Sequence, residues 1–119
     1  MKKANSDFNK LFSLVKEGTD LGKSKGSENI LVATIKCGEE LGELCAEVLK
    51  YVDYKKSKET NKSILKKIKS EGTDAIIAIL NVLNLVDTEK QEIIDHTTSA
   101  VEKWKQKHLK TNGSKRKNK

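Results

Sequence analysis

The sequence predicts an all-α protein, a bundle of four helices with a short first helix and a basic tail. Proline is absent from all 119 residues, and aromatic residues make up only 4%. Lys, Glu, Leu, Ile and Val abound, and apolar residues recur with helical spacing in successive segments. The length fits one domain, which we place at residues 1–110, followed by a tail over residues 111–119 that we expect to be disordered.

The first helix is predicted over residues 5–17. Asn5 or Ser6 would cap it. Residues 18–27 include three glycines among polar side chains and are predicted to form a loop. The Gly-Lys-Ser string in this loop lacks the upstream glycine and the preceding strand of a phosphate-binding loop. The apolar face of the helix is formed by Phe8, Leu11, Phe12 and Val15.

The second helix is predicted from Ser27 to about Tyr54. Cys37 and Cys45 lie too far apart on it to form a disulfide, and we interpret both as small buried apolar residues. The acidic residues of this helix are expected to border its buried face. The apolar stripe that defines that face comprises Ile30, Cys37, Leu41, Leu44, Cys45, Val48 and Val52.

The third helix is predicted from about Asn61 to Val86. Residues 75–80 are apolar on every side of the helix, which predicts a central position in the bundle.

The fourth helix follows a turn at residues 87–89. Asp87 or Thr88 would be its N-cap, with Gln91 or Glu92 completing a capping box. Trp104 lies on the apolar face of this helix, where we expect it to fill the core, with stacking on a base as the alternative.

Two carboxylate pairs stand out on the second and third helices. Glu40 and Glu43 are three residues apart, and so are Glu71 and Asp74. Residues three apart project from one face of a helix, so that facing helices would bring four carboxylates together. Such a cluster is stable only with cations, and an all-oxygen ligand set suits Mg²⁺ or Mn²⁺.

The order and spacing of these acids carry a family resemblance. Glu39, Glu40 and Glu43 form an EExxE pattern, and Glu71 and Asp74 form the ExxD pattern that follows it. Over residues 28–108 the chain resembles the MazG-type all-α nucleoside triphosphate pyrophosphohydrolases. The resemblance implies a metal-dependent enzyme that cleaves (d)NTP to (d)NMP and pyrophosphate and clears unwanted nucleotides.

The resemblance also implies roles for individual residues. Glu39 would orient the attacking water or support a metal ligand. Lys103 and Lys107 stand where the family carries basic residues that contact phosphate, although an arginine common there is missing. Their alternative role is to complement the dipole of the last helix. The metal ligands, for Mg²⁺ or Mn²⁺, would be Glu40, Glu43, Glu71 and Asp74.

Hydropathy and charge indicate the cellular location that we expect for the protein and where its positive charge lies. The longest apolar run, residues 75–80, is far too short to span a bilayer, and no apolar signal core follows the N-terminus, so we expect a cytoplasmic protein. The net charge of +7 arises in residues 103–119, which hold eight Lys and Arg side chains and no acid. A core of this size and the resemblance both favour a homodimer or homotetramer.

The sequence leaves two other functions open. A phosphoribosyl-ATP pyrophosphohydrolase would share a related fold and carboxylate motif. A nucleic-acid-binding protein would act through the basic tail, with weak, salt-dependent and sequence-independent affinity. A four-helix di-iron site is excluded because the chain has no Glu-x-x-His motif.

Overall fold

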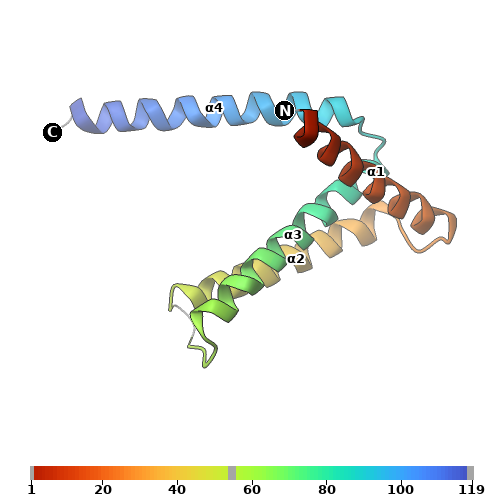
Figure 1. Cartoon of the computed structure of the whole chain (residues 1–119), viewed down its shortest axis with the longest axis horizontal. Helices are drawn as coiled ribbons and strands as arrows, with labels where there is room; N and C mark the ends of the chain where they lie inside the picture. The colour runs from red at the N-terminus through yellow and green to blue at the C-terminus, as the bar shows by residue number, and fades with distance from the viewer. Residues whose placement is uncertain (1, 54–55, 118–119) are drawn as a thin grey trace. The chain divides into compact units, whose positions relative to one another are not determined.

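The protein is described here from a computed structural model. The backbone is described for residues 2–53 and 56–117, and the side chains for residues 7–53 and 56–110. This part of the chain forms four α-helices and no strand, which confirms the predicted all-α fold. The helices are α1 (Lys2–Ser24), α2 (Ile30–Tyr51), α3 (Asn61–Leu85) and α4 (Lys90–Lys117) (Figure 1).

The helices divide into two compact units. Residues 1–87, with α1, α2 and α3, form the first unit, and residues 88–119, with α4, form the second. Among the described residues no helix is both long and apolar enough to cross a membrane.

The first helix is longer than the sequence predicts. α1 covers 23 residues and begins at Lys2, so that Asn5 and Ser6 lie inside the helix and do not cap it. The predicted loop over residues 18–27 is wrong in its first part, because Gly18 and Gly22 are helical. A glycine inside a helix costs only about 1 kcal/mol relative to alanine, which a longer helix can tolerate.

The end of α1 is a Schellman motif centred on Gly26. Gly26 adopts a left-handed conformation with φ 71°, which glycine enters without steric strain. Its N–H donates to the carbonyl of Lys23, and the N–H of Ser27 donates to the carbonyl of Gly22, both at 3.0 Å. Of the three glycines in the predicted loop, only this one reverses the chain.

α2 and α3 run antiparallel, side by side, as a hairpin (Figure 1). Asn29 caps α2 by accepting a hydrogen bond from the N–H of Val32 at 3.0 Å. Thr60 caps α3 in the same way, accepting from the N–H of Ser63 at 3.1 Å. These caps fix both N-termini, and the extents of the two helices agree with the prediction to within a few residues.

The face of α2 that is buried differs from the predicted one. Its buried residues are Ala33, Glu40 and Glu47, which recur at heptad spacing along the seam with α3. The predicted apolar stripe instead lies largely outward: Cys37 is half-buried, Cys45 is exposed, and both thiols are free. The other members of the stripe that lie exposed are Ile30, Leu41, Val48 and Val52.

α3 is only partly buried within the first unit. Ala75, Ala78 and Leu80 are buried, but their apolar neighbours Ile76 and Ile77 are exposed. The expected central position of α3 in a four-helix bundle stays a prediction. Among the described residues the buried apolar set is small, namely Phe12, Ala33, Ile64, Ala75, Ala78 and Leu80.

α4, considered alone, begins with a partial capping box. Glu92 Oε1 accepts a hydrogen bond from the N–H of Glu89 at 3.0 Å, so that the cap lies later than the predicted Asp87 or Thr88. Trp104 is 60% exposed and meets His108 edge to face within this unit, and its predicted place in the core stays a prediction.

The helix continues to Lys117, past the predicted end of the domain. The expected disorder of the tail over residues 111–119 stays a prediction: its side chains and residues 118–119 lie outside the described residues.

Alanine at the two helical glycines of α1 should have opposite effects. Nothing lies within 4 Å of a Cβ added at Gly18, so Gly18→Ala should raise the free energy of unfolding by about 0.5–1 kcal/mol. A Cβ at Gly22 would lie 2.7 Å from Glu28 Cβ, so Gly22→Ala should forfeit this gain or destabilise. Urea unfolding at one protein concentration measures both, and equal stabilisation by the two variants would contradict the packing of residue 28 on α1.

Candidate functional site

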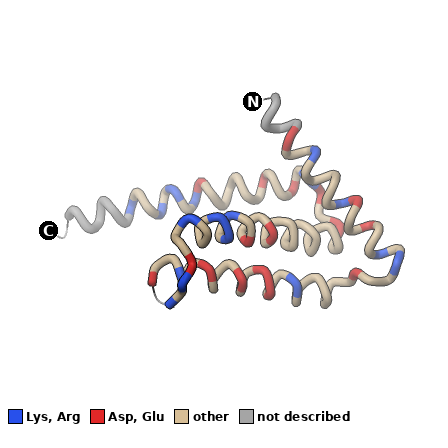
Figure 2. Tube along the Cα trace, turned by 60° about the horizontal axis from the view of Figure 1, so that its bottom comes forward, with Lys and Arg blue, Asp and Glu red and all other residues tan. Residues whose placement is uncertain are grey.

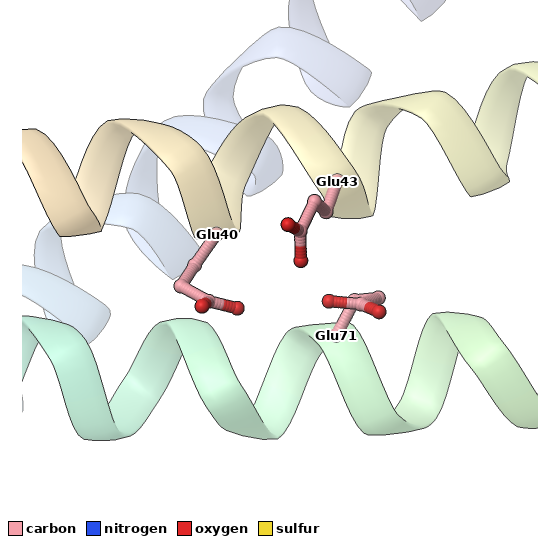
Figure 3. Close-up of side chains that lie close together, drawn as sticks. All are labelled: Glu40, Glu43 and Glu71. Carbon is pink, nitrogen blue, oxygen red and sulfur yellow. The ribbon is translucent and has the colours of Figure 1, made fainter.

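Three of the four predicted carboxylates meet in the α2–α3 seam. Glu40 and Glu43 project from α2 and Glu71 from α3, and their side chains point toward one another (Figure 3). One carboxylate oxygen from each residue lies within 4.8 Å of the other two. The i, i+3 spacing on α2 and the antiparallel pairing of the helices produce this arrangement, as the sequence predicted.

The cluster contains buried oxygens without hydrogen bonds. Glu40 is only 6% exposed, Glu71 is half-buried and Glu43 is exposed. Oε2 of Glu40 and Oε2 of Glu71 are buried, and neither accepts a hydrogen bond from the described residues. Buried carboxylate oxygens are normally paired, because leaving them unpaired carries a large desolvation penalty. These converging oxygen donors therefore fit a hard divalent cation such as Mg²⁺ or Mn²⁺.

The three carboxylates also perturb one another. A hydrogen bond with the Glu43 carboxyl raises the pKa of Glu71 above its ordinary value, and burial and the negative charges of Glu43, Asp74 and Glu40 add to the increase. The hydrogen bond, burial and repulsion among like charges thus favour the protonated form of Glu71 in the absence of a cation. A proton and a metal ion would compete for the same oxygens.

Lys36 supplies a positive charge at one edge of the cluster. Its Nζ lies 3.0 Å from Glu40 Oε1 and 3.7 Å from Glu39 Oε2. The hydrogen bond and the charge of Glu40 raise the pKa of Lys36. Sequence reasoning missed this residue, although its i, i+4 spacing to Glu40 was a usable signal.

Glu39 and Asp74 lie outside the group of three. Glu39 is exposed and pairs with Lys36 on the outer side of α2. Asp74 is exposed and contributes no oxygen to the cluster, although its charge acts on Glu71. Their predicted roles, in orienting water and in binding metal, stay predictions.

A second buried acid on α2, Glu47, is paired with a lysine of the same chain, although its Oε1 is also buried without a hydrogen bond from the described residues. Glu47 pairs with Lys50 at 3.0 Å, Lys50 with Glu59 at 3.2 Å, and Glu59 with Lys67 at 2.8 Å. The network ties the end of α2 to the beginning of α3. Figure 2 shows acidic residues along both of these helices and basic residues toward the start of α3. The sequence analysis did not single out this network, whose members are far apart in the chain.

The two predicted phosphate ligands belong to the second unit. Lys103 and Lys107 are exposed on one face of α4, at i, i+4 spacing, together with Lys110. Their predicted contact with phosphate stays a prediction.

Comparison of the chain with models of protein families, with curated proteins and with solved structures gave no match. The resemblance to the MazG-type enzymes therefore rests on the carboxylate motifs.

Glu71→Gln should remove part of the pH dependence of stability in metal-free protein. Folding raises the pKa of Glu71 above its ordinary value of 4.5, so the folded state binds more protons than the unfolded state above that pH. The free energy of unfolding of the wild type should therefore fall as the pH rises through the folded-state pKa. The glutamine variant should lose less stability and exceed the wild type at pH 7.

Urea unfolding in EDTA at several pH values between 4 and 8 measures this difference. Glu17→Gln on α1 removes a carboxylate outside the cluster and serves as the control. Parallel pH profiles for the wild type and Glu71→Gln would show that the cluster does not hold the proton.

Proposed function

We propose that the protein is a metal-dependent nucleoside triphosphate pyrophosphohydrolase of MazG type, which cleaves (d)NTP to (d)NMP and pyrophosphate. Its role would be to clear unwanted nucleotides in the cytoplasm. The observation that carries the proposal is the convergence of Glu40, Glu43 and Glu71, with buried oxygens that lack a partner. The reaction class, hydrolysis of a nucleoside triphosphate to the monophosphate and pyrophosphate, is inferred from the EExxE and ExxD patterns.

The charge of the cluster determines what it can bind. A triphosphate is strongly anionic, and three converging carboxylates would repel it without cations between them. A bound Mg²⁺ or Mn²⁺ would polarise a phosphoryl oxygen and lower the pKa of a bound water. Glu40, Glu43 and Glu71 would hold the cation. The negative charge of Asp74 acts on Glu71, so Asp74 would add to the attraction for the cation.

The protonation of Glu71 and the contact of Lys36 with Glu40 would both affect how the cluster binds a cation. The raised pKa of Glu71 means that a proton competes with a cation for its oxygens, so metal affinity should increase with pH. Lys36 holds Glu40 in place through its bond at 3.0 Å and offsets part of the negative charge.

The proposal is tested by product release from a panel of substrates with Mg²⁺ or Mn²⁺. The panel contains ribo- and deoxyribonucleoside triphosphates, and phosphoribosyl-ATP as the alternative substrate. We expect monophosphate and pyrophosphate in equal amounts, only with metal. Glu40→Gln and Glu71→Gln should each reduce kcat/KM by at least about a hundredfold, since even residues that merely support a ligand cost 10–100-fold.

Glu17→Gln, outside the cluster, is the matched control and should retain full activity. Turnover that survives in both cluster variants, or in EDTA, would contradict the proposal. Turnover of phosphoribosyl-ATP alone would leave the site intact and change the substrate.

We propose further that the protein acts as a homodimer or homotetramer. In the first unit the apolar face of α2 is exposed, and α3 likewise exposes apolar residues. Patches of this kind on small proteins mark association sites. Burial against a second copy would complete a core that one chain leaves small. The exposed residues of these faces include Ile30, Leu31, Ile35, Leu41, Val48, Val52, Ile76 and Ile79.

Ile35→Glu should shift the protein toward the monomer. Ile35 is 57% exposed in a single copy, so a charge there costs little in the monomer but a great deal in an apolar interface. Sedimentation velocity over a range of concentrations should show at least a tenfold weaker association. Ser13→Glu adds the same charge at an exposed polar position of α1 and is the control. A wild type that stays monomeric at every concentration would refute the proposed association.

A further inference from the structure

The tip of the α2–α3 hairpin carries a concentration of positive charge. Residues 56–70 cover the end of the connection and the first turns of α3, and they contain six lysines and a single acid, Glu59. Figure 2 shows basic residues gathered at the start of α3. All six lysines are exposed. They are Lys56, Lys58, Lys62, Lys66, Lys67 and Lys69.

Most of this charge is not balanced by acids of the same chain. Glu59 already pairs with Lys67 at 2.8 Å and with Lys50 at 3.2 Å. The other five lysines of the segment form no ion pair within the part of the chain that the structure describes. The tip of the hairpin is therefore a positive surface whose counter-charge must come from outside the chain.

Three of these lysines form a row along α3. Lys62, Lys66 and Lys69, which we call the lysine row, stand at i, i+4 and i+7 and therefore share one face of the helix. The buried Ile64 lies on the opposite side. The row extends over about 10 Å, since the helix rises about 1.5 Å per residue. The same length of duplex DNA carries about six phosphate charges.

The electrostatics of α3 opposes lysines at this position. The N-terminal end of a helix has a partial positive charge, so acids stabilise its first turn and lysines do not. α3 has no acid in its first turn, and Lys62 is its second residue. Like charges four residues apart, here Lys62 and Lys66, also repel each other. The lysine row thus lowers the stability of the helix, and a bound polyanion would reverse this effect.

We propose that the lysine row, together with Lys56 and Lys58, binds the phosphate backbone of a nucleic acid. The row faces away from the α2–α3 seam into which Glu71 projects, so the inference does not depend on the proposed reaction. Lysines that neutralise phosphates release the counterions of the nucleic acid. The affinity is therefore high at low salt and does not depend on sequence.

The composition of the segment favours a nucleic acid over a membrane surface. A helix that lies on a membrane buries apolar and aromatic side chains opposite its basic ones. Residues 56–70 contain no aromatic residue, and their one exposed apolar side chain is Leu65. The segment also lacks the aromatic and arginine side chains on which bases stack. Contacts to phosphate remain, and these position a protein without reading sequence.

Fluorescence anisotropy with a labelled DNA duplex of about 20 base pairs tests the proposal in the full-length protein. EDTA in the buffer removes cations that could bridge phosphate to the carboxylate cluster. The row variant Lys62→Gln/Lys66→Gln/Lys69→Gln removes three charges and keeps a similar helix propensity. We expect at least about tenfold weaker binding at about 50 mM salt. The slope of log K against log salt concentration should become less steep by about 2–3.

A matched variant removes the same charge from another helix. It replaces three exposed lysines of α1, and we expect less than about a threefold loss of affinity. An equal loss in this control and in the row variant would show that only net charge matters and would overturn the inference. The control changes are Lys10→Gln, Lys16→Gln and Lys23→Gln.

A third variant tests the basic tail, with Lys115→Gln, Arg116→Gln and Lys117→Gln. Loss of binding in the tail variant but not in the row variant would overturn the inference in favour of the tail. Urea unfolding checks that each variant is folded. If the row variant does not fold, the single changes Lys62→Gln, Lys66→Gln and Lys69→Gln should each reduce the salt slope by about 1.

Two further probes identify the anion. Titration with duplex RNA of the same sequence shows which nucleic acid the lysine row prefers, and a loss of affinity in the row variant with either duplex supports the inference. Vesicles of phosphatidylserine that bind the wild type but not the row variant, with no such difference for either duplex, would overturn it in favour of a membrane. A wild type that binds neither duplex at about 50 mM salt would overturn it as well.

Discussion

Mutual repulsion of carboxylates in the α2–α3 seam is the constraint around which the rest of the first unit is arranged. A hairpin of this kind is most simply stabilised by apolar side chains along its seam. This one instead places Glu40, Glu43 and Glu71 together, two of them with buried unpaired oxygens. Lys36 relieves only part of that repulsion, and the pKa of Glu71 is raised. The proposed cation site would give the arrangement a physical purpose that stability alone does not.

The acidic seam also explains why so much apolar surface faces outward. α2 has only one face toward α3, and the heptad of Ala33, Glu40 and Glu47 occupies it. The apolar stripe of the same helix must then lie on another face, which α1 and α3 leave largely exposed. The proposed site and the proposed association are therefore linked: the orientation of α2 that assembles the carboxylates is the one that exposes the stripe.

The sequence predicted the helices better than their faces. Local signals sufficed for α2 and α3, because capping residues and apolar periodicity act within a few residues of each terminus. Intervals of three residues likewise predicted the meeting of Glu40, Glu43 and Glu71. The length of α1 was missed because glycines read as loop residues are tolerated in a helix, and only Gly26 takes a left-handed conformation. The buried face of α2 and the pairs that Glu59 makes with Lys50 and Lys67 depend on contacts between elements, which no local pattern encodes.

Glu40 and Glu47, two buried acidic residues on the same face of α2, differ in how far lysines of the same chain balance the negative charge around them. Glu47 pairs with Lys50, and Lys50 and Lys67 both pair with Glu59, so two lysines balance two acids, although Oε1 of Glu47 is itself buried without a hydrogen bond from the described residues. One heptad earlier, Glu40 has a single lysine but faces two further carboxylates. A cluster with this excess of negative charge would be able to bind a divalent ion, whereas a further lysine there would exclude one. The difference in charge balance between the two clusters is the physical argument that favours a ligand at the first and a role in the fold at the second.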